Sequence, residues 1–190
     1  MSGIAPVPGT RADASVRTGV VTDAPAVGLV QATVWQSAYA GRVPDEVVTL
    51  FEGPAFARAW RDSLAAPPAG VHRLLVACVG PQVVGFAAVG PSQDPDAGPA
   101  TGEVTALGVH PAARRQGHGS RLLNACVDVL REAGAEEVVA WLLADDEASR
   151  AFLLGCGLGP DGAWRDRVVA PDGATLREVR LVAALGDGPE

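Results

Sequence analysis

The sequence has little cysteine, and this shortage excludes two classes of protein. Its three cysteines, Cys78, Cys126 and Cys156, are odd in number and widely spaced along 190 residues. Such a set fits neither a disulfide framework nor a zinc-binding pattern. We therefore expect reduced thiols, a cytoplasmic setting and no metal site.

Basic residues and long apolar runs are also scarce. Lys and Arg number 15 against 22 acidic residues, a formal net charge of −7. A nucleic-acid-binding protein usually presents a basic face, so we expect no nucleic-acid partner. The best apolar runs, residues 74–79 and 83–89, are separated by Gly80-Pro81. Neither reaches the roughly 20 residues that span a bilayer, so we expect no membrane partner.

What the chain does contain is enough apolar material for one domain with a sizeable core. Hydrophobic residues make up 48% of it, beside 23 glycines and 15 prolines. Its length is ordinary for a single domain. Residues 1–15 are rich in Gly, Pro, Ala and Ser without periodicity, which predicts a disordered tail. We expect residues 16–190 to form the domain.

Hydrophobic periodicity predicts an α+β fold. Helices are expected after Thr22-Asp23, and at 44–51, 56–64, 120–133 and 146–154. Strands are expected at 15–21, 73–79, 82–89, 103–109, 137–143, 164–169 and 175–181. Residues 91–100 hold three prolines and two aspartates and are expected to form a loop. The order of these elements predicts a mixed sheet.

Residues 104–123 carry the chemical signal. A predicted strand ends at Val109, and Gly117 and Gly119 then precede an amphipathic helix. Backbone N–H groups in a glycine-rich turn at a helix start attract anions. Four potentially positive side chains occur within eight residues of this acidic chain, which points to a phosphate-bearing ligand: Arg114, Arg115, His118 and Arg121. The segment lacks the Lys-Ser/Thr pair of a Walker A loop and the third glycine of a dinucleotide fingerprint.

Residues 114–119, RRQGHG, fit the pattern Q/R-x-x-G-x-G/A. With this motif the chain resembles the GNAT superfamily of N-acetyltransferases, over about residues 16–183. The resemblance implies a mostly antiparallel central sheet of about six to seven strands flanked by helices. It also implies acetyl-CoA as co-substrate, with its pyrophosphate on the backbone amides of this loop. The residues implied to bind it are Leu107, Gly108, Val109, Arg114, Arg115, Gln116, Gly117, His118, Gly119 and Ser120.

The resemblance implies two catalytic groups. The Val109 amide would polarise the thioester carbonyl, and Glu103 would act as the base. The alternative for Glu103 is a solvated residue at a strand end. The family's usual acid is a tyrosine, but Leu153 stands at that position and Tyr39 is the only tyrosine in the chain.

The implied activity is transfer of an acetyl group to a primary amine of an unidentified small-molecule or peptide acceptor, by direct attack. The alternative is a catalytically silent acyl-CoA-binding module of the same fold. The amine-bearing acceptor is the expected partner, and a homodimer is left open. Three acidic residues, Asp145, Asp146 and Glu147, either attract that amine or cap the following helix, and we favour capping.

Overall fold

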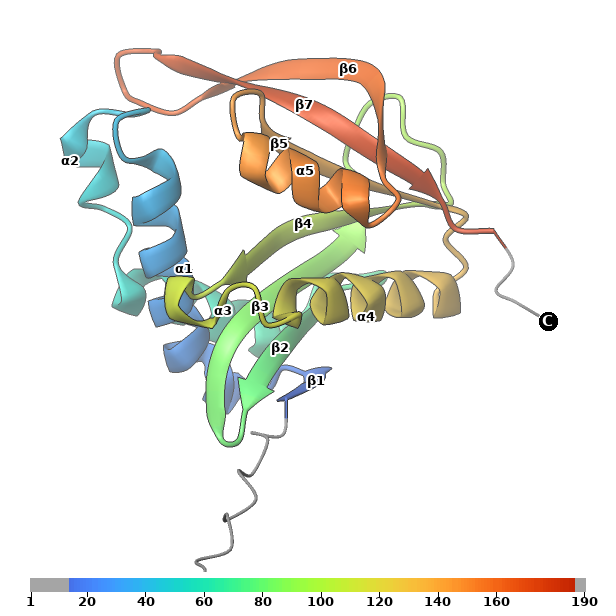
Figure 1. Cartoon of the computed structure of the whole chain (residues 1–190), viewed down its shortest axis with the longest axis horizontal. Coiled ribbons are helices and arrows are strands. Elements are labelled where there is room, and N and C mark those ends of the chain that lie inside the picture. Colours follow the sequence, from blue (N-terminus) through green and yellow to red (C-terminus); the bar gives the residue numbers. More distant parts are fainter. Residues whose placement is uncertain (1–13, 187–190) are drawn as a thin grey trace, which may run out of the picture.

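A seven-stranded sheet organises residues 14–186, which are the residues that the computed structural model describes (Figure 1). The strands are β1 (Ala14–Thr18), β2 (Arg73–Val79), β3 (Gln82–Pro91), β4 (Thr101–Val109), β5 (Glu137–Leu143), β6 (Gly159–Val168) and β7 (Thr175–Ala184). The helices are α1 (Ala24–Tyr39), α2 (Asp45–Val48), α3 (Gly53–Ala65), α4 (His118–Glu132) and α5 (Glu147–Gly155), with 3-10 turns η1 (Val21–Asp23) and η2 (Pro111–Ala113). The predicted α+β class is confirmed.

The strand order is β1-β2-β3-β4-β5-β7-β6, and β4 with β5 is the parallel pair in an otherwise antiparallel sheet. The hairpin predicted at Gly80-Pro81 joins β2 to β3. The β4–β5 pairing covers only Thr101–Val104 against Glu137–Ala140. Beyond Val104, β4 continues to Val109 beside β3 alone, so a gap opens between β4 and β5 (Figure 1).

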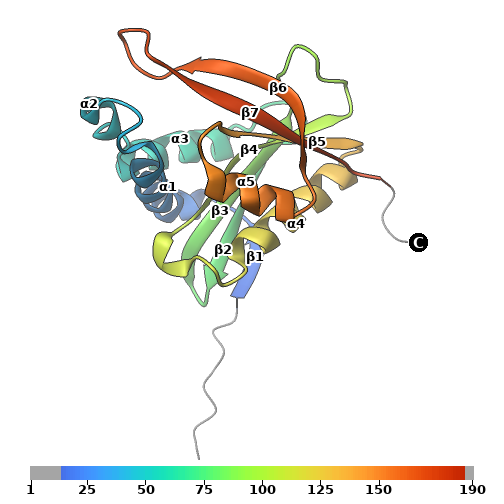
Figure 2. The same ribbon diagram turned by 45° about the horizontal axis from the view of Figure 1, so that its top comes forward.

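Helices cover both faces of the sheet (Figure 2). On one face, α4 and α5 bury leucines such as Leu122, Leu130 and Leu153 against β2, β3 and β5. On the other face, α1 packs its valines against Phe86 of β3, and α3 packs against α1. The four-residue and three-residue spacing of these apolar side chains places them on one face of each helix, which is the pattern that predicted the helices.

The contact between α1 and α3 depends on a glycine. A β-carbon at Gly28 would lie 2.5 Å from the carbonyl oxygen of Gly53 and 2.7 Å from the backbone nitrogen of Ala57. Real side chains do not tolerate such distances. The absence of a side chain at Gly28 therefore lets the two helix backbones approach closely.

Several element boundaries differ from the prediction, and three of them concern the edge strands of the sheet. Residues 1–13 of the predicted tail lie outside the described residues, but Ala14 and Ser15 belong to β1, where they pair with β2. The predicted first strand ends earlier, at Thr18, because Asp23 accepts hydrogen bonds from Val20 N (2.9 Å) and Arg17 and shapes η1. The strand β6 begins at Gly159, five residues before the predicted start.

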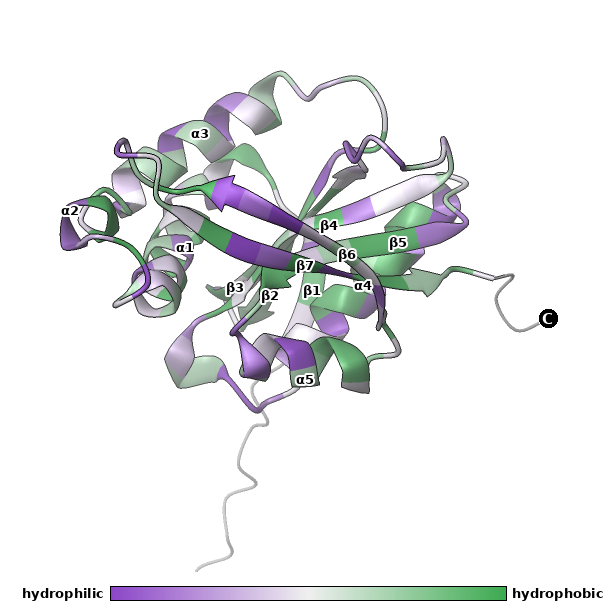
Figure 3. Cartoon of the chain, turned by 90° about the horizontal axis from the view of Figure 1, so that it is seen from above, coloured by the Kyte–Doolittle hydropathy of each residue, from purple (hydrophilic) through white to green (hydrophobic). Residues whose placement is uncertain are grey.

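The two strands at the C-terminal edge are the most polar part of the sheet. Most residues of β6 are exposed, whereas most of β5 is buried. Figure 3 shows hydrophilic residues along β6 and β7 and a largely hydrophobic β5. Among the described helices, none combines the length and the apolar character needed to cross a bilayer.

Candidate functional site

The gap between β4 and β5 exposes backbone donors. In an antiparallel pair, successive residues direct their N–H and C=O groups to alternate sides of the strand. The N–H of His110 donates to Val84 of β3 (2.8 Å), so the backbone groups of Leu107 and Val109 point the other way, into the gap. The Val109 carbonyl accepts a bond from Arg114 Nε (3.1 Å) on that side. Within residues 14–186, β5 pairs with β4 only as far as Val104, so the gap-facing N–H groups of Leu107 and Val109 can meet a ligand.

Gly108 departs from the prediction that residues 107–109 all donate. By the same alternation its backbone groups face Phe86 of β3, with which it pairs. A β-carbon there would lie 2.9 Å from the Phe86 ring and 3.5 Å from the Trp35 ring. Gly108 thus gives these rings room beside the site and donates no hydrogen bond into the gap.

The loop between η2 and α4 forms a second set of free donors. Arg115 has φ +63°, a left-handed conformation that is uncommon for a residue with a side chain, and Gly117 has φ +79°. Within residues 14–186, no protein acceptor takes the N–H groups of residues 115–120. Such a turn at a helix N-terminus gathers N–H groups around an anion, so these residues fit a phosphate-bearing group.

Arg121, which the sequence analysis left out of the binding set, adds positive charge to this loop. Its Nη1 donates to the Gln116 carbonyl (3.2 Å), and a β-carbon at Gly117 would lie 3.5 Å from the same nitrogen. The signal in the sequence was its position four residues after Gly117, one helical turn into α4.

His118 contributes differently from Arg121. Its side chain is 2% exposed, and neither ring nitrogen has a hydrogen-bond partner within the described chain. Burial, aided by the charge of Arg121, lowers the pKa of His118, which disfavours the charged form of the ring. Only the backbone of His118 remains available to a ligand.

Glu103 lies half-buried on β4, on the face opposite Gly102 and Leu130. Burial is the main cause that raises its pKa, and the carboxylate of Asp94 raises it further. Three groups lower the pKa of Glu103 instead: Arg165, the Gln93 N–H and the Ser92 hydroxyl. A carboxylate with a raised pKa is a stronger base than an exposed one, which suits the predicted role.

No tyrosine occupies the position where the family places its acid. Leu153 is 8% exposed and belongs to the core beneath α5. Tyr39 lies at the end of α1, with its ring 5.4 Å from that of Phe51. Burial raises the pKa of Tyr39. Its position is that of a packed aromatic residue.

The acidic residues after β5 each have a partner. Asp146 caps α5 by accepting from the Ser149 N–H (3.0 Å) and hydroxyl (2.7 Å), which confirms the capping interpretation for this residue. Asp145 pairs with Arg42, and Glu147 with Arg150. The loop at 91–100 also contributes Asp94 to the surroundings of Glu103, which the sequence analysis did not anticipate although two aspartates stand there.

Comparisons with known proteins agree with this geometry. A family model described as "Acetyltransferase (GNAT) family" matches residues 35–158. No curated protein matches the chain by sequence. Among solved structures, the chain is similar to the PaiA N-acetyltransferase of Thermoplasma acidophilum in complex with coenzyme A, with a TM-score of 0.69 and 14% identity over 88% of this chain and 98% of that one.

Two further structures show the same likeness. YncA of Salmonella typhimurium, solved with its cofactor acetyl-CoA, has a TM-score of 0.62 and 20% identity over 93% of this chain and 96% of that one. The ribosomal-protein-alanine N-acetyltransferase of Brucella melitensis has a TM-score of 0.66 and 21% identity over 90% and 99%. At identities this low, the likeness shows the fold alone. With the family model covering most of the sheet and the loop at 114–119, the chain belongs to the acetyltransferase (GNAT) family, which uses acetyl-CoA.

Proposed function

We propose that this chain transfers the acetyl group of acetyl-CoA to a primary amine of a small-molecule or peptide acceptor, by direct attack of the amine. The observation that carries the proposal is the succession of three features along one segment. Half-buried Glu103 comes first, the gap-facing N–H groups of Leu107 and Val109 follow, and the free N–H groups of residues 115–120 complete it. Glu103 suits the acceptance of a proton, the strand N–H groups suit hydrogen bonding to a carbonyl oxygen, and the loop N–H groups suit the binding of a pyrophosphate.

The loop residues hold the donor. The free N–H groups of residues 115–120 bind the pyrophosphate, and Arg115 and Arg121 add positive charge around it. When bound, acetyl-CoA supplies an acetyl group activated as a thioester. Fixing both reactants in a productive orientation contributes up to about 7–11 kcal/mol to lowering the barrier.

Val109 and Glu103 act on the reacting groups. The Val109 N–H donates to the thioester carbonyl oxygen, where negative charge develops during the attack. Glu103 accepts the proton that an ammonium group must lose before its nitrogen can attack. A thiol has a pKa of about 8.5, so the sulfur can leave as a thiolate although Leu153 offers no proton.

Leu153 also favours a second candidate, a catalytically silent acyl-CoA-binding module of the same fold. Such a protein would keep the loop at 115–120 and lose the chemistry. For both candidates, the three free cysteines suit the cytoplasmic setting that we propose.

A coupled assay of CoA release over a panel of primary amines separates the two candidates. The panel contains polyamines, aminoglycosides, amino acids and peptides with free N-termini. We expect amine-dependent CoA release by the wild type, matched by acetylated product. Tight acetyl-CoA binding without transfer to any amine would instead establish the silent module.

The variant Glu103→Gln tests the base. We expect kcat to fall by about 10²–10⁴-fold, the usual contribution of a positioned base. The Kd of acetyl-CoA, measured by calorimetry, should stay within about twofold because Glu103 lies away from the loop. Glu132→Gln, an exposed change at the end of α4, is the matched control. Equal turnover of Glu103→Gln across the pH range would remove Glu103 from the mechanism.

A further inference from the structure

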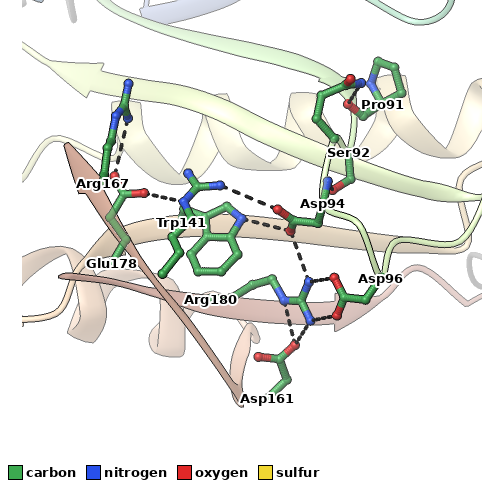
Figure 4. A network of polar contacts seen from close by, with 11 residues as sticks. Pro91, Ser92, Asp94, Asp96, Trp141, Asp161, Arg167, Glu178 and Arg180 are labelled. Carbon is green, nitrogen blue, oxygen red and sulfur yellow. Dashed lines mark hydrogen bonds and ion pairs between the residues drawn. The ribbon is translucent and has the colours of Figure 1, made fainter. Parts of the chain in front are cut away.

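The loop between β3 and β4 is attached through Asp94 to the strands β5, β7 and β6. The Asp94 side chain is 8% exposed, and a carboxylate so buried needs partners. Its Oδ2 accepts from Trp141 Nε1 of β5 (3.0 Å) and from Arg180 Nη1 of β7 (3.1 Å). Its Oδ1 lies 3.5 Å from Arg165 Nη1 of β6. Figure 4 shows Asp94 directed at Trp141 and Arg180.

Arg180 is the centre of this attachment. Its guanidinium, in a side chain that is 11% exposed, bonds Asp94, Asp96 at 2.7 and 2.8 Å, and Asp161 at 2.8 Å (Figure 4). The planar group can donate in several directions at once, so it joins the loop to the start of β6. Asp94 is therefore held at a fixed place.

Arg165 of β6 is also held in place by neighbouring strands. Its Nε lies 2.6 Å from Glu178 Oε2, and its guanidinium carbon lies 4.1 Å from the centre of the Trp141 ring. Arg165 also bonds no residue of α1 or α3 among those described. Its position is set by Trp141 of β5, Glu178 of β7 and Asp94 of the loop.

Glu103 thus faces two fixed, opposite charges. Glu103 pairs with the uncharged Val139 of β5, and Trp141 lies two residues further along, on the same face of β5. The Trp141 Nε1 donates to Asp94 (3.0 Å), and the Arg165 guanidinium lies 4.1 Å from the centre of the Trp141 ring, so both charges lie on the face of the sheet that carries Glu103. Ser92 and Gln93, which precede Asp94 in the loop, favour the charged form of Glu103. A nearby negative charge favours the protonated carboxyl and a nearby positive charge the carboxylate. Asp94 therefore favours the protonated form of Glu103, and Arg165 favours its charged form.

We propose that Asp94 and Arg165 are positioning residues that set the proton affinity of Glu103, with Arg180 and Trp141 fixing where Asp94 stands. This inference rests on the proposed function, because the proton affinity of Glu103 matters only if Glu103 serves as a base.

The variants Asp94→Asn and Arg165→Gln test the proposal with opposite expected signs. Because both close bonds of Asp94 go to Oδ2, asparagine can keep them through its single oxygen while losing the charge. We expect Asp94→Asn to move the acidic limb of the kcat/KM profile to lower pH and Arg165→Gln to move it to higher pH. Asp96→Asn is the control, since it removes a carboxylate of the same loop that also bonds Arg180 but does not face Glu103.

A direct titration separates this inference from the proposed function. The carboxyl carbon of Glu103, labelled with carbon-13 and assigned by its loss in Glu103→Gln, reports its protonation by NMR in the free protein. We expect Asp94→Asn to move the titration midpoint of Glu103 to lower pH and Arg165→Gln to move it to higher pH. The control Asp96→Asn should leave the midpoint unchanged. Thermal melting checks that each variant is folded. If Asp94→Asn does not fold, Arg165→Gln decides alone, because Arg165 lies on the exposed edge strand.

The outcomes are distinct. Opposite displacements in the titration support the inference even if no amine in the panel is acetylated, a result that would count against the proposed function alone. An active wild type whose pH profile and titration are unmoved by Arg165→Gln overturns the inference and leaves the proposed function standing. Displacement in the same direction by both variants also overturns it.

Discussion

The Nε atom of Arg42 lies 3.0 Å from Asp145 Oδ2, which joins the segment after α1 to the turn after β5. The two residues are 103 positions apart in the chain. Arg42 follows α1, which packs on β3 and β4, whereas Asp145 follows β5, on the other side of the gap. The ion pair therefore spans the divergence on which the candidate site depends.

This pair should contribute little to stability. The side chains of Arg42 and Asp145 are 28% and 68% exposed, and water screens such pairs. In a double-mutant cycle of Arg42→Ala and Asp145→Ala, measured by urea denaturation, we expect a coupling free energy below about 1 kcal/mol. The coupling should shrink in 1 M salt. A coupling that is large and insensitive to salt would contradict this expectation.

Gly117→Ala should weaken binding of acetyl-CoA. Alanine at φ +79° costs about 1–2 kcal/mol, so the loop will relax and the N–H groups of residues 115–120 will lose their arrangement. We expect a higher Kd by calorimetry and a lower melting temperature. Gly155→Ala is the control, since a β-carbon there meets no atom within 4 Å. Unchanged affinity in Gly117→Ala would argue against this loop as the phosphate site.

Gly28→Ala should destabilise the fold without touching the candidate site. Its methyl group would meet the Gly53 carbonyl oxygen at 2.5 Å, so α1 and α3 must move apart. Overpacking of this kind typically costs about 1–3 kcal/mol, read from the shift of the denaturation midpoint. An unchanged midpoint would mean that the two helices are not packed as closely as the structure has them.

Asp23→Asn should reduce stability at neutral pH but not at low pH. The side-chain bonds from Arg17 are the largest cause that lowers the pKa of Asp23 in the folded chain, so the unfolded chain takes up its proton first on acidification. The stability from this carboxylate is present above about pH 4 and is lost as the pH falls through the folded-state pKa. We expect a loss of about 1 kcal/mol at pH 7, allowing for the exposure of Arg17.

Melting curves at several pH values check this prediction. The difference between wild type and Asp23→Asn should close as the pH falls below 4. A constant difference at all pH values would show that the charge of Asp23 is not what stabilises the start of α1.

One cysteine should react quickly with a thiol reagent in the native protein. Cys156 is exposed at the end of α5, whereas Cys78 and Cys126 are buried, and burial raises the pKa of the Cys126 thiol to about 12. Titration with dithiobis-nitrobenzoate should release one equivalent rapidly and the others only in denaturant. Cys156→Ser should abolish the rapid phase. Rapid release of a second equivalent would mean that a buried thiol is accessible.

The sequence by itself determined the order and kind of most elements. Apolar spacing located α1, α4 and α5, and the Gly80-Pro81 turn located the β2–β3 hairpin, because these signals are local in the chain. The motif at 114–119 likewise located the loop whose N–H groups have no protein acceptor among residues 14–186, since its shape depends on the local backbone, left-handed at Arg115 and Gly117. The start of β6 was misplaced because an exposed edge strand has weak hydrophobic alternation.

Only the tertiary structure decided which backbone groups face the gap and what surrounds Glu103. That Leu107 and Val109 point into the gap while Gly108 does not follows from the register with β3, which no local pattern specifies. Asp94, Arg165 and Arg180 meet because the loop between β3 and β4 reaches across to β5, β7 and β6. Their electrostatic effect depends on distances between residues up to 86 positions apart in the chain, and the sequence fixes such distances only through the complete fold.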